Sequence, residues 1–150
     1  MRRIFRRLAS RSERLGELWE LAKSERSSPP QTGLSVAVGV FSACTPFIGF
    51  HMWIALGLAT ALRLNRLWAF IGSRLSVGPV FAGIVFCEIE SGHRLRSGHW
   101  MPLALRDAVA HLGDLIVDCL VGTPIVGGGI AAAAGLAAYA LARRRRALRG

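Results

Sequence analysis

The segment CLVGTPIVGGGIAAAAGLAAYALA, from Cys119 to Ala142, contains no charged residue and is followed directly by four arginines, Arg143 to Arg146. An apolar helix of roughly 20 residues is long enough to cross the hydrocarbon core of a bilayer. Basic residues that flank such a helix are typical of its cytoplasmic end. The sequence therefore predicts an all-α membrane protein with a transmembrane helix over 119–142 and a basic tail over 143–150.

The composition agrees with a membrane protein. Of the 150 residues, 52% are hydrophobic and only 19% are charged, yet the formal net charge is +10. A soluble domain usually carries a larger charged fraction, and a disordered chain lacks such long apolar runs. A nucleic-acid-binding protein spreads its basic residues over a polar surface and not beside uncharged segments. We therefore expect membrane lipids as partners and no nucleic acid.

The charges fall in blocks along the chain. Residues 1–26 carry +4, residues 88–118 carry −2, and the C-terminal arginines carry +5; between them Arg63, Arg66 and Arg74 add +3. The positive-inside rule keeps the basic blocks in the cytoplasm. This pattern predicts a multi-pass plasma-membrane protein with both termini cytoplasmic. Its second transmembrane helix covers 67–87 and tolerates Arg74, and an external amphipathic segment covers 88–118.

The first apolar run, Ser27 to Leu62, is too long for one upright helix and contains Pro46. A proline inside a helix removes one backbone donor and clashes with the preceding turn. We expect two half-length helices that form a re-entrant hairpin over 33–62, with its bend at Thr45-Pro46. A single tilted crossing is the alternative, but it would place the four consecutive arginines outside, against the positive-inside rule.

Residues 1–28 combine apolar positions at helical spacing with clustered arginines. The pattern predicts a basic amphipathic cytoplasmic helix that either lies on anionic lipid or is a solvated tail. Pro29-Pro30 is expected to end this helix. The remainder, 29–150, is expected to form a single helical membrane domain.

Polar residues in the predicted external segment fall on one helical face: Asp107, His111, Asp114 and Asp118. This row is either a cation site or the water-facing side of an interfacial helix. The cysteines Cys44, Cys87 and Cys119 are far apart and form no C-x-x-C pair, which indicates free thiols. We expect no metal and no cofactor. No catalytic constellation is visible, and the protein is not expected to be an enzyme.

The stretch GVFSACTPFIGFH over 39–51, followed by LRLN over 62–65, is similar to a known pattern. It resembles domain of unknown function family 2062 (DUF2062), whose members are bacterial integral membrane proteins. The Asn-Pro often seen in that family is absent near Val77-Gly78. The resemblance implies a bacterial inner-membrane protein and no established reaction. The matching positions are Ala37, Gly39, Phe41, Pro46, Gly49, Phe50, His51, Arg63, Leu64 and Asn65.

The Pro46 break is the predicted functional site. A proline there leaves a carbonyl one turn upstream without its donor, Gly49 admits a second backbone, and His51 is the nearest titratable group. Broken membrane helices of this kind point at ions or anionic groups in transporters. We expect the protein to bind or translocate an ion or an anionic lipid here. The candidate ligand or lipid-site residues are Thr45, Pro46, Gly49, His51, Arg63, Asn65, Arg66 and Arg74.

Two other function classes remain open at this point. One is a non-catalytic membrane scaffold or interaction protein, and the other is a membrane enzyme acting on a lipid-linked substrate. Because so few helices enclose little volume, a homo-oligomer or a membrane-protein partner is expected. The pentapeptide at 45–49 recurs as Thr123-Pro124-Ile125-Val126-Gly127, which indicates either an internal repeat or chance. The glycines and alanines of 127–135 indicate a packing face.

Overall fold

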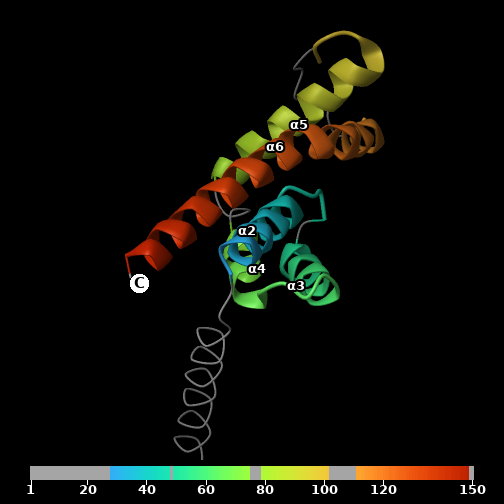
Figure 1. Cartoon of the computed structure of the whole chain (residues 1–150). Coiled ribbons are helices and arrows are strands. Elements are labelled where there is room, and N and C mark those ends of the chain that lie inside the picture. The colour runs from blue at the N-terminus through green and yellow to red at the C-terminus, as the bar shows by residue number, and fades with distance from the viewer. Residues whose placement is uncertain (1–27, 48, 75–78, 102–110, 149–150) are drawn as a thin grey trace, which may run out of the picture.

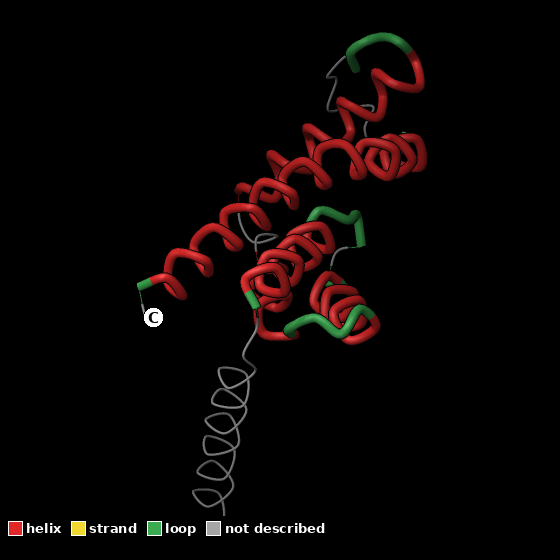
Figure 2. The backbone as a smooth tube through the Cα atoms, viewed as in Figure 1, coloured by secondary structure: helices red, strands yellow, loops and turns green. Residues whose placement is uncertain are grey.

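The computed structural model describes residues 28–47, 49–74, 79–101 and 111–148, and this part of the chain is all-helical. Figures 1 and 2 show its helices and the short loops that join them. No strand occurs within the described residues, so the predicted all-α class is confirmed for them. The helices are α2 (Pro29–Ala43), α3 (His51–Ala61), α4 (Arg66–Ser73), α5 (Pro79–Ser97) and α6 (Leu112–Ala147).

Helix α6 is the one described helix that is long and apolar enough to cross a membrane. It contains 36 residues, which corresponds to about 54 Å of helix and exceeds a hydrocarbon core of about 30 Å. The predicted helix over 119–142 is thus part of a longer one. The predicted tail does not begin a separate segment, because α6 continues through Arg143 to Arg146.

The first apolar run is divided as Pro46 predicts. Helix α2 begins after the N-cap Ser28, whose hydroxyl forms a capping box with Gln31. Pro29 occupies the first helical position, where its missing N–H is harmless, so Pro29-Pro30 opens α2. Helices α2 and α3 contain 15 and 11 residues, and each is shorter than a transmembrane span. Re-entry of this pair into a membrane stays a prediction, and the predicted helix over 1–28 lies outside the described residues apart from Ser28.

The single helix predicted over 67–87 is wrong. Helix α4 ends at Ser73, and α5 begins at Pro79 and runs to Ser97 across the predicted boundary at 87/88. Proline is favoured in the first turn of a helix, where its missing N–H is harmless, and Pro79 is the first residue of α5. The predicted external segment over 88–118 is also not a separate element, because its two ends belong to α5 and α6.

Helix α6 packs along α5 and α2, while α3 and α4 pack against α2 (Figure 1). Small side chains recur at every fourth position on the buried face of α6, which is typical of helices that approach closely in membranes. The predicted packing face is confirmed at Gly127, Ala131 and Gly135 only, since Gly128 and Gly129 have open space around them and residues 132–133 are exposed. The face consists of Cys119, Thr123, Gly127, Ala131 and Gly135.

Several polar side chains are buried, and many large apolar side chains are exposed. The largest fully buried side chains are Glu88, Asp118, Cys44, Ser35 and Ser42. Large apolar side chains face outward instead, among them Trp53 at 65% and Leu136 at 68% exposure. Water-soluble domains bury their large apolar residues and keep carboxylates at the surface. This arrangement suits an apolar solvent around the helices.

Candidate functional site

The backbone at the Pro46 break has partners within the chain. Pro46 cannot donate to the carbonyl of Ser42, one turn upstream. That carbonyl accepts instead from the backbone N–H of Thr45 at 3.3 Å and from the Thr45 hydroxyl at 2.8 Å. The predicted unpaired carbonyl is therefore wrong, because the threonine before the proline satisfies it.

His51 closes the same break from the side of α3. Its Nε2 donates to the carbonyl oxygen of Thr45 at 2.7 Å, since a carbonyl oxygen can only accept. The residue is 7% exposed, and its ring packs edge-on against Phe81 of α5 with the ring centroids 5.6 Å apart. This hydrogen bond of His51 links the start of α3 to the end of α2, and the side chain of His51 is buried against α5.

Gly49 shapes the turn. Its φ is +89°, in the left-handed region that glycine adopts without strain. A Cβ placed there would meet nothing within 4 Å. The prediction that Gly49 admits a second backbone is wrong, and the glycine is needed for its conformation.

Arg63 ends α3 in a Schellman motif. The N–H of Leu64 donates to the carbonyl of Ala59 at 2.7 Å, and the N–H of Arg63 donates to the carbonyl of Thr60 at 3.2 Å. Arg63 has φ +53°, at the position where such motifs usually carry glycine. The arginine therefore occupies a strained backbone position, with its side chain exposed.

Asn65 has a structural role between α3 and α4. Its side-chain oxygen accepts from the N–H groups of Leu67 at 2.9 Å and Trp68 at 3.3 Å, which caps α4. Its own N–H donates to the hydroxyl of Ser35 at 3.0 Å. Asn65 is 5% exposed, so it anchors the α3–α4 turn to α2 and holds the neighbouring Arg66 at the surface.

The three internal arginines do not form one cluster. Arg63 and Arg66 flank Asn65, whereas Arg74 follows the last residue of α4 and stacks over Phe70 at 4.4 Å. Arg66 to Arg74 spans about 12 Å along a helix. The predicted site thus separates into a satisfied Pro46 break, an arginine pair at the α3–α4 turn, and a distant Arg74.

A buried carboxyl that the sequence assigned to the external segment lies where α5 crosses α6. Glu88 is 0% exposed, and its Oε2 accepts from the thiol of Cys119 at 3.3 Å. Its Oε1 has no hydrogen-bond partner among the described residues. Glycines let the two backbones meet here: a Cβ on Gly122 would lie 1.9 Å from the Glu88 carbonyl oxygen, and one on Gly92 would lie 1.8 Å from that of Asp118.

A second buried carboxyl, Asp118, lies one helical turn from this crossing and is fully paired. It is 1% exposed. Its Oδ1 accepts from Nη1 of Arg96 at 2.5 Å, and its Oδ2 lies 2.9 Å from Nδ1 of His93. The side chains of His93 and Arg96 are 27% and 41% exposed. Asp118 is therefore not on a water-facing row as predicted, but part of a charged network that links α5 to α6.

The acidic row, the second Thr-Pro pentapeptide and the cysteines form no site of their own in the described part of the chain. Asp107 lies outside the described residues, while His111 and Asp114 are exposed. Pro124 lies inside the continuous helix α6, where the Thr123 hydroxyl donates to the Cys119 carbonyl at 2.8 Å. The two Thr-Pro pentapeptides thus have different structures, and only the first breaks a helix. The three cysteines are free thiols.

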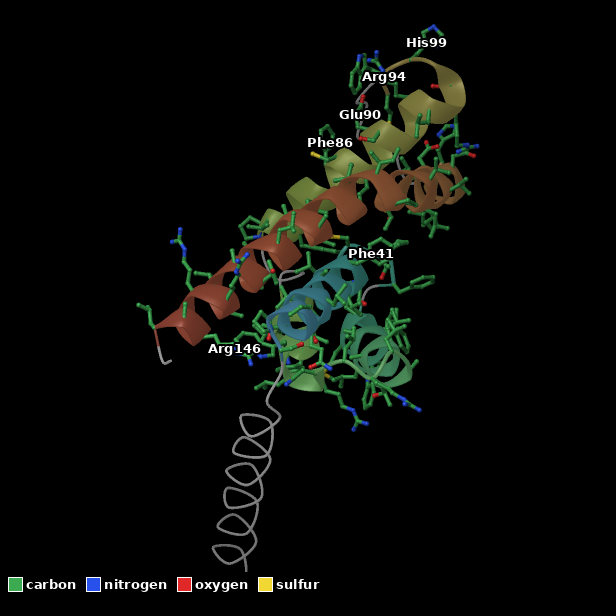
Figure 3. The ribbon with its side chains drawn as sticks, in the orientation of Figure 1. Phe41, Phe86, Glu90, Arg94, His99 and Arg146 are labelled. Carbon is green, nitrogen blue, oxygen red and sulfur yellow. The ribbon has the colours of Figure 1, made fainter. Side chains whose placement is uncertain are left out.

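The net charge differs between the two ends of the bundle. The acidic residues that the structure describes lie on α5 and the first turns of α6, together with Arg94 and Arg96, whereas Arg143 to Arg146 lie at the other end of α6, where no acidic residue is described. Figure 3 shows Glu90, Arg94 and His99 at one end of the molecule and Arg146 toward the opposite end of α6.

The arginine pair at the α3–α4 turn belongs to the basic end. The backbone of Gly33 approaches Tyr139, one turn before Arg143, and Ser35 binds Asn65. The N-terminal half of α2 therefore connects the α3–α4 turn to the C-terminal part of α6.

A family model described as "Uncharacterized protein conserved in bacteria (DUF2062)" matches residues 13–149. The match agrees with the resemblance carried by the Pro46 and Arg63 motifs. No curated protein and no solved structure matches the chain.

Proposed function

The chain belongs to the DUF2062 family of uncharacterized bacterial proteins, and from that premise we propose a non-enzymatic protein of the bacterial inner membrane that holds anionic lipid headgroups. The headgroup phosphates bind the exposed arginines at the basic end of the bundle. The observation that carries this proposal is the unbalanced positive charge at one end of helices whose sides expose large apolar residues.

The outward-facing apolar side chains support a lipid environment. The most apolar window of α6 is only 33% buried, whereas a core helix of a soluble protein is mostly buried. Leu120, Ile125, Leu136 and Leu141 of this helix are all exposed. The buried residues of α6 are small or polar, which favours close helix packing in lipid.

The arginines supply the lipid contact. Within the described residues, neither Arg63 nor Arg66 forms an ion pair, and both are exposed beside the exposed Leu62. A basic residue near an anionic bilayer surface contributes about 1 kcal/mol. Arg143 to Arg146 extend the same end of the molecule, and the positive-inside rule assigns this end to the cytoplasm.

This proposal moves the ligand away from the Pro46 break. The Ser42 and Thr45 carbonyls there are already paired. The guanidinium groups at the α3–α4 turn remain available, and a phosphate diester is a good acceptor for them.

The experiment is a titration of the detergent-purified protein with fluorescent phosphatidylglycerol and, separately, phosphatidylcholine. The double variant Arg63→Gln with Arg66→Gln should lose about 2 kcal/mol, or roughly 30-fold, in phosphatidylglycerol affinity. Arg94→Gln, at the opposite end and stacked on Trp100, is the control and should bind like the wild type. Equal affinity for both lipids, or an equal loss in the control, would refute lipid recognition at this end.

The topology is tested with single cysteines at exposed positions at the two ends. Arg66→Cys and His99→Cys should react with an impermeant maleimide from opposite sides of oriented membrane vesicles. Labelling of both from one side would contradict the proposed orientation. A stoichiometric heterologous protein that co-purifies without bound lipid would favour the scaffold alternative.

A further inference from the structure

We propose that Glu88 is a proton-binding site inside the helix bundle, and that its proton exchanges with water through the Asp118 network. The site lies where α5 and α6 cross beside the end of α2. It is independent of the lipid site at the basic end.

The geometry of Glu88 leaves one oxygen without a donor. Oε2 accepts from Cys119, and Oε1 has no partner within the described part of the chain. A Cβ on Gly127 would lie 3.1 Å from Oε1 and 2.8 Å from the Cβ of Cys44. The carboxyl and Cys44 therefore meet over Gly127, at a point where three helices approach one another.

Among the residues that the structure describes, no basic side chain forms an ion pair with Glu88. The groups that face Glu88 are the thiols of Cys119 from α6 and Cys44 from α2, together with Thr123. Of the basic side chains on α5, His93 and Arg96 contact Asp118, and Arg94 stacks over Trp100. An isolated buried carboxylate is so costly that such a group takes up a proton instead. The neutral acid fits the site, because its uncharged carbonyl oxygen tolerates a missing donor better than a charged oxygen does.

The ligand is a proton and not a metal ion. Among the described residues, no group of three or more His, Cys, Asp or Glu is placed to hold a metal. One oxygen of the carboxyl accepts from a thiol, and the other has no hydrogen-bond donor among the described residues. This arrangement suits the binding of a proton. Ionisable side chains inside membrane bundles are expensive and commonly line proton paths, so a glutamate at a glycine-packed crossing calls for a role beyond packing.

The Asp118 network leads from this site toward water. Gly92, one turn after Glu88, contacts the Asp118 backbone, and one helical turn is about 5.4 Å. His93 binds Asp118 and is partly exposed. Through its contact with the partly exposed His93, the buried Asp118 carboxyl is connected to the surface of the bundle. A small separation of the α5–α6 crossing on this side would let a proton from water reach Glu88.

The first test is infrared spectroscopy of the protein reconstituted in phosphatidylcholine vesicles. The wild type should show the carbonyl stretching band of a protonated carboxylic acid at neutral pH, and the band should disappear on raising the pH. Glu88→Gln, which keeps the shape of the side chain, should lack the band. Glu90→Gln should keep it, because Glu90 is the neighbouring carboxyl and accepts from the N–H of Met101. Absence of the band in the wild type, or its persistence in Glu88→Gln, would overturn the proposal.

The second test uses dicyclohexylcarbodiimide, which modifies protonated carboxyls in apolar surroundings. Mass spectrometry of the wild type should locate the adduct at Glu88, with less adduct as the pH rises. His93→Gln should slow hydrogen–deuterium exchange of the carboxyl, seen as a slower isotope shift of the infrared band. If the carboxyl exchanged at the wild-type rate in His93→Gln, the proton would not reach Glu88 through the Asp118 network. Phosphatidylglycerol binding by Glu88→Gln should equal that of the wild type, so the two proposals fail separately.

Discussion

Gly122→Ala tests the close crossing that places Glu88 inside the bundle. An alanine Cβ at position 122 would lie 1.9 Å from the carbonyl oxygen of Glu88 and 2.6 Å from its carbonyl carbon. The obstacle is backbone, which cannot rotate away as a side chain can. The helices must therefore separate by about 1.5 Å before these atoms reach ordinary contact.

The expected loss follows from this separation. A gap of 0.5–1 Å already forfeits about a quarter to a half of a dispersion contact, and overpacking a tight interior costs about 1–3 kcal/mol. The replacement also gains about 1 kcal/mol of helix propensity. Gly129→Ala on the same helix has the same propensity gain and open space around its Cβ. The difference between the two variants therefore isolates the crossing, and we expect Gly122→Ala to be less stable than Gly129→Ala by about 3 kcal/mol.

Reversible unfolding in mixed micelles, driven by added dodecyl sulfate and followed by circular dichroism, measures this difference. Gly129→Ala should unfold at or above the wild-type midpoint, and Gly122→Ala clearly below it. If Gly122→Ala were as stable as Gly129→Ala, the two helices would not approach at Gly122. The buried environment inferred for Glu88 would then be wrong as well.

Two further predictions use the same unfolding measurement. Arg63→Gly should stabilise the fold by about 1 kcal/mol, because glycine adopts the left-handed backbone conformation without strain. Arg63→Ala should leave the stability unchanged. If the two variants had equal effects, the positive φ of Arg63 would carry no strain. Arg96→Met should lower the free energy of unfolding by about 3 kcal/mol, because it leaves the buried Asp118 carboxylate underpaired. Asp118→Asn should lower it by only about 1 kcal/mol, because water can hydrate the partly exposed Arg96. A larger loss in Asp118→Asn than in Arg96→Met would contradict this pairing.

The sequence predicts those features that depend on local rules. Pro46 and Gly49 break the first apolar run at the observed place, and the uncharged run before Arg143 lies within one long helix. Pro79 is also a signal in the sequence, since proline is favoured at the first position of a helix and disfavoured in its interior. The prediction of one helix over 67–87 rests on a length that suits a bilayer and gives this signal too little weight.

The roles of the site residues depend on tertiary contacts, which the sequence conceals. His51 resembles a titratable ligand until Thr45 and Phe81 are seen around it. Asn65 carried a local signal, because Asn is a preferred N-cap, and the structure shows it in that position. A polar residue beside a helix break is therefore first a candidate for satisfying the backbone, and becomes a ligand candidate only when its own partners are absent.

Glu88 was missed because counting charges assigns every acidic residue to the aqueous side. A periodicity signal was nevertheless present: Ile84, Glu88 and Gly92 recur at every fourth position and form the buried face of α5. In lipid, apolar side chains have no preference for the interior, so a helix turns inward the residues that pack closely or need polar partners. An acid spaced four residues from a glycine is then a candidate for burial, and the glycine indicates which face the partner helix covers. Glu90 differs from Glu88 in this respect, because its half-buried side chain lies off that face and accepts from the Met101 backbone N–H. Glu90 is therefore the proper control for the buried proton site.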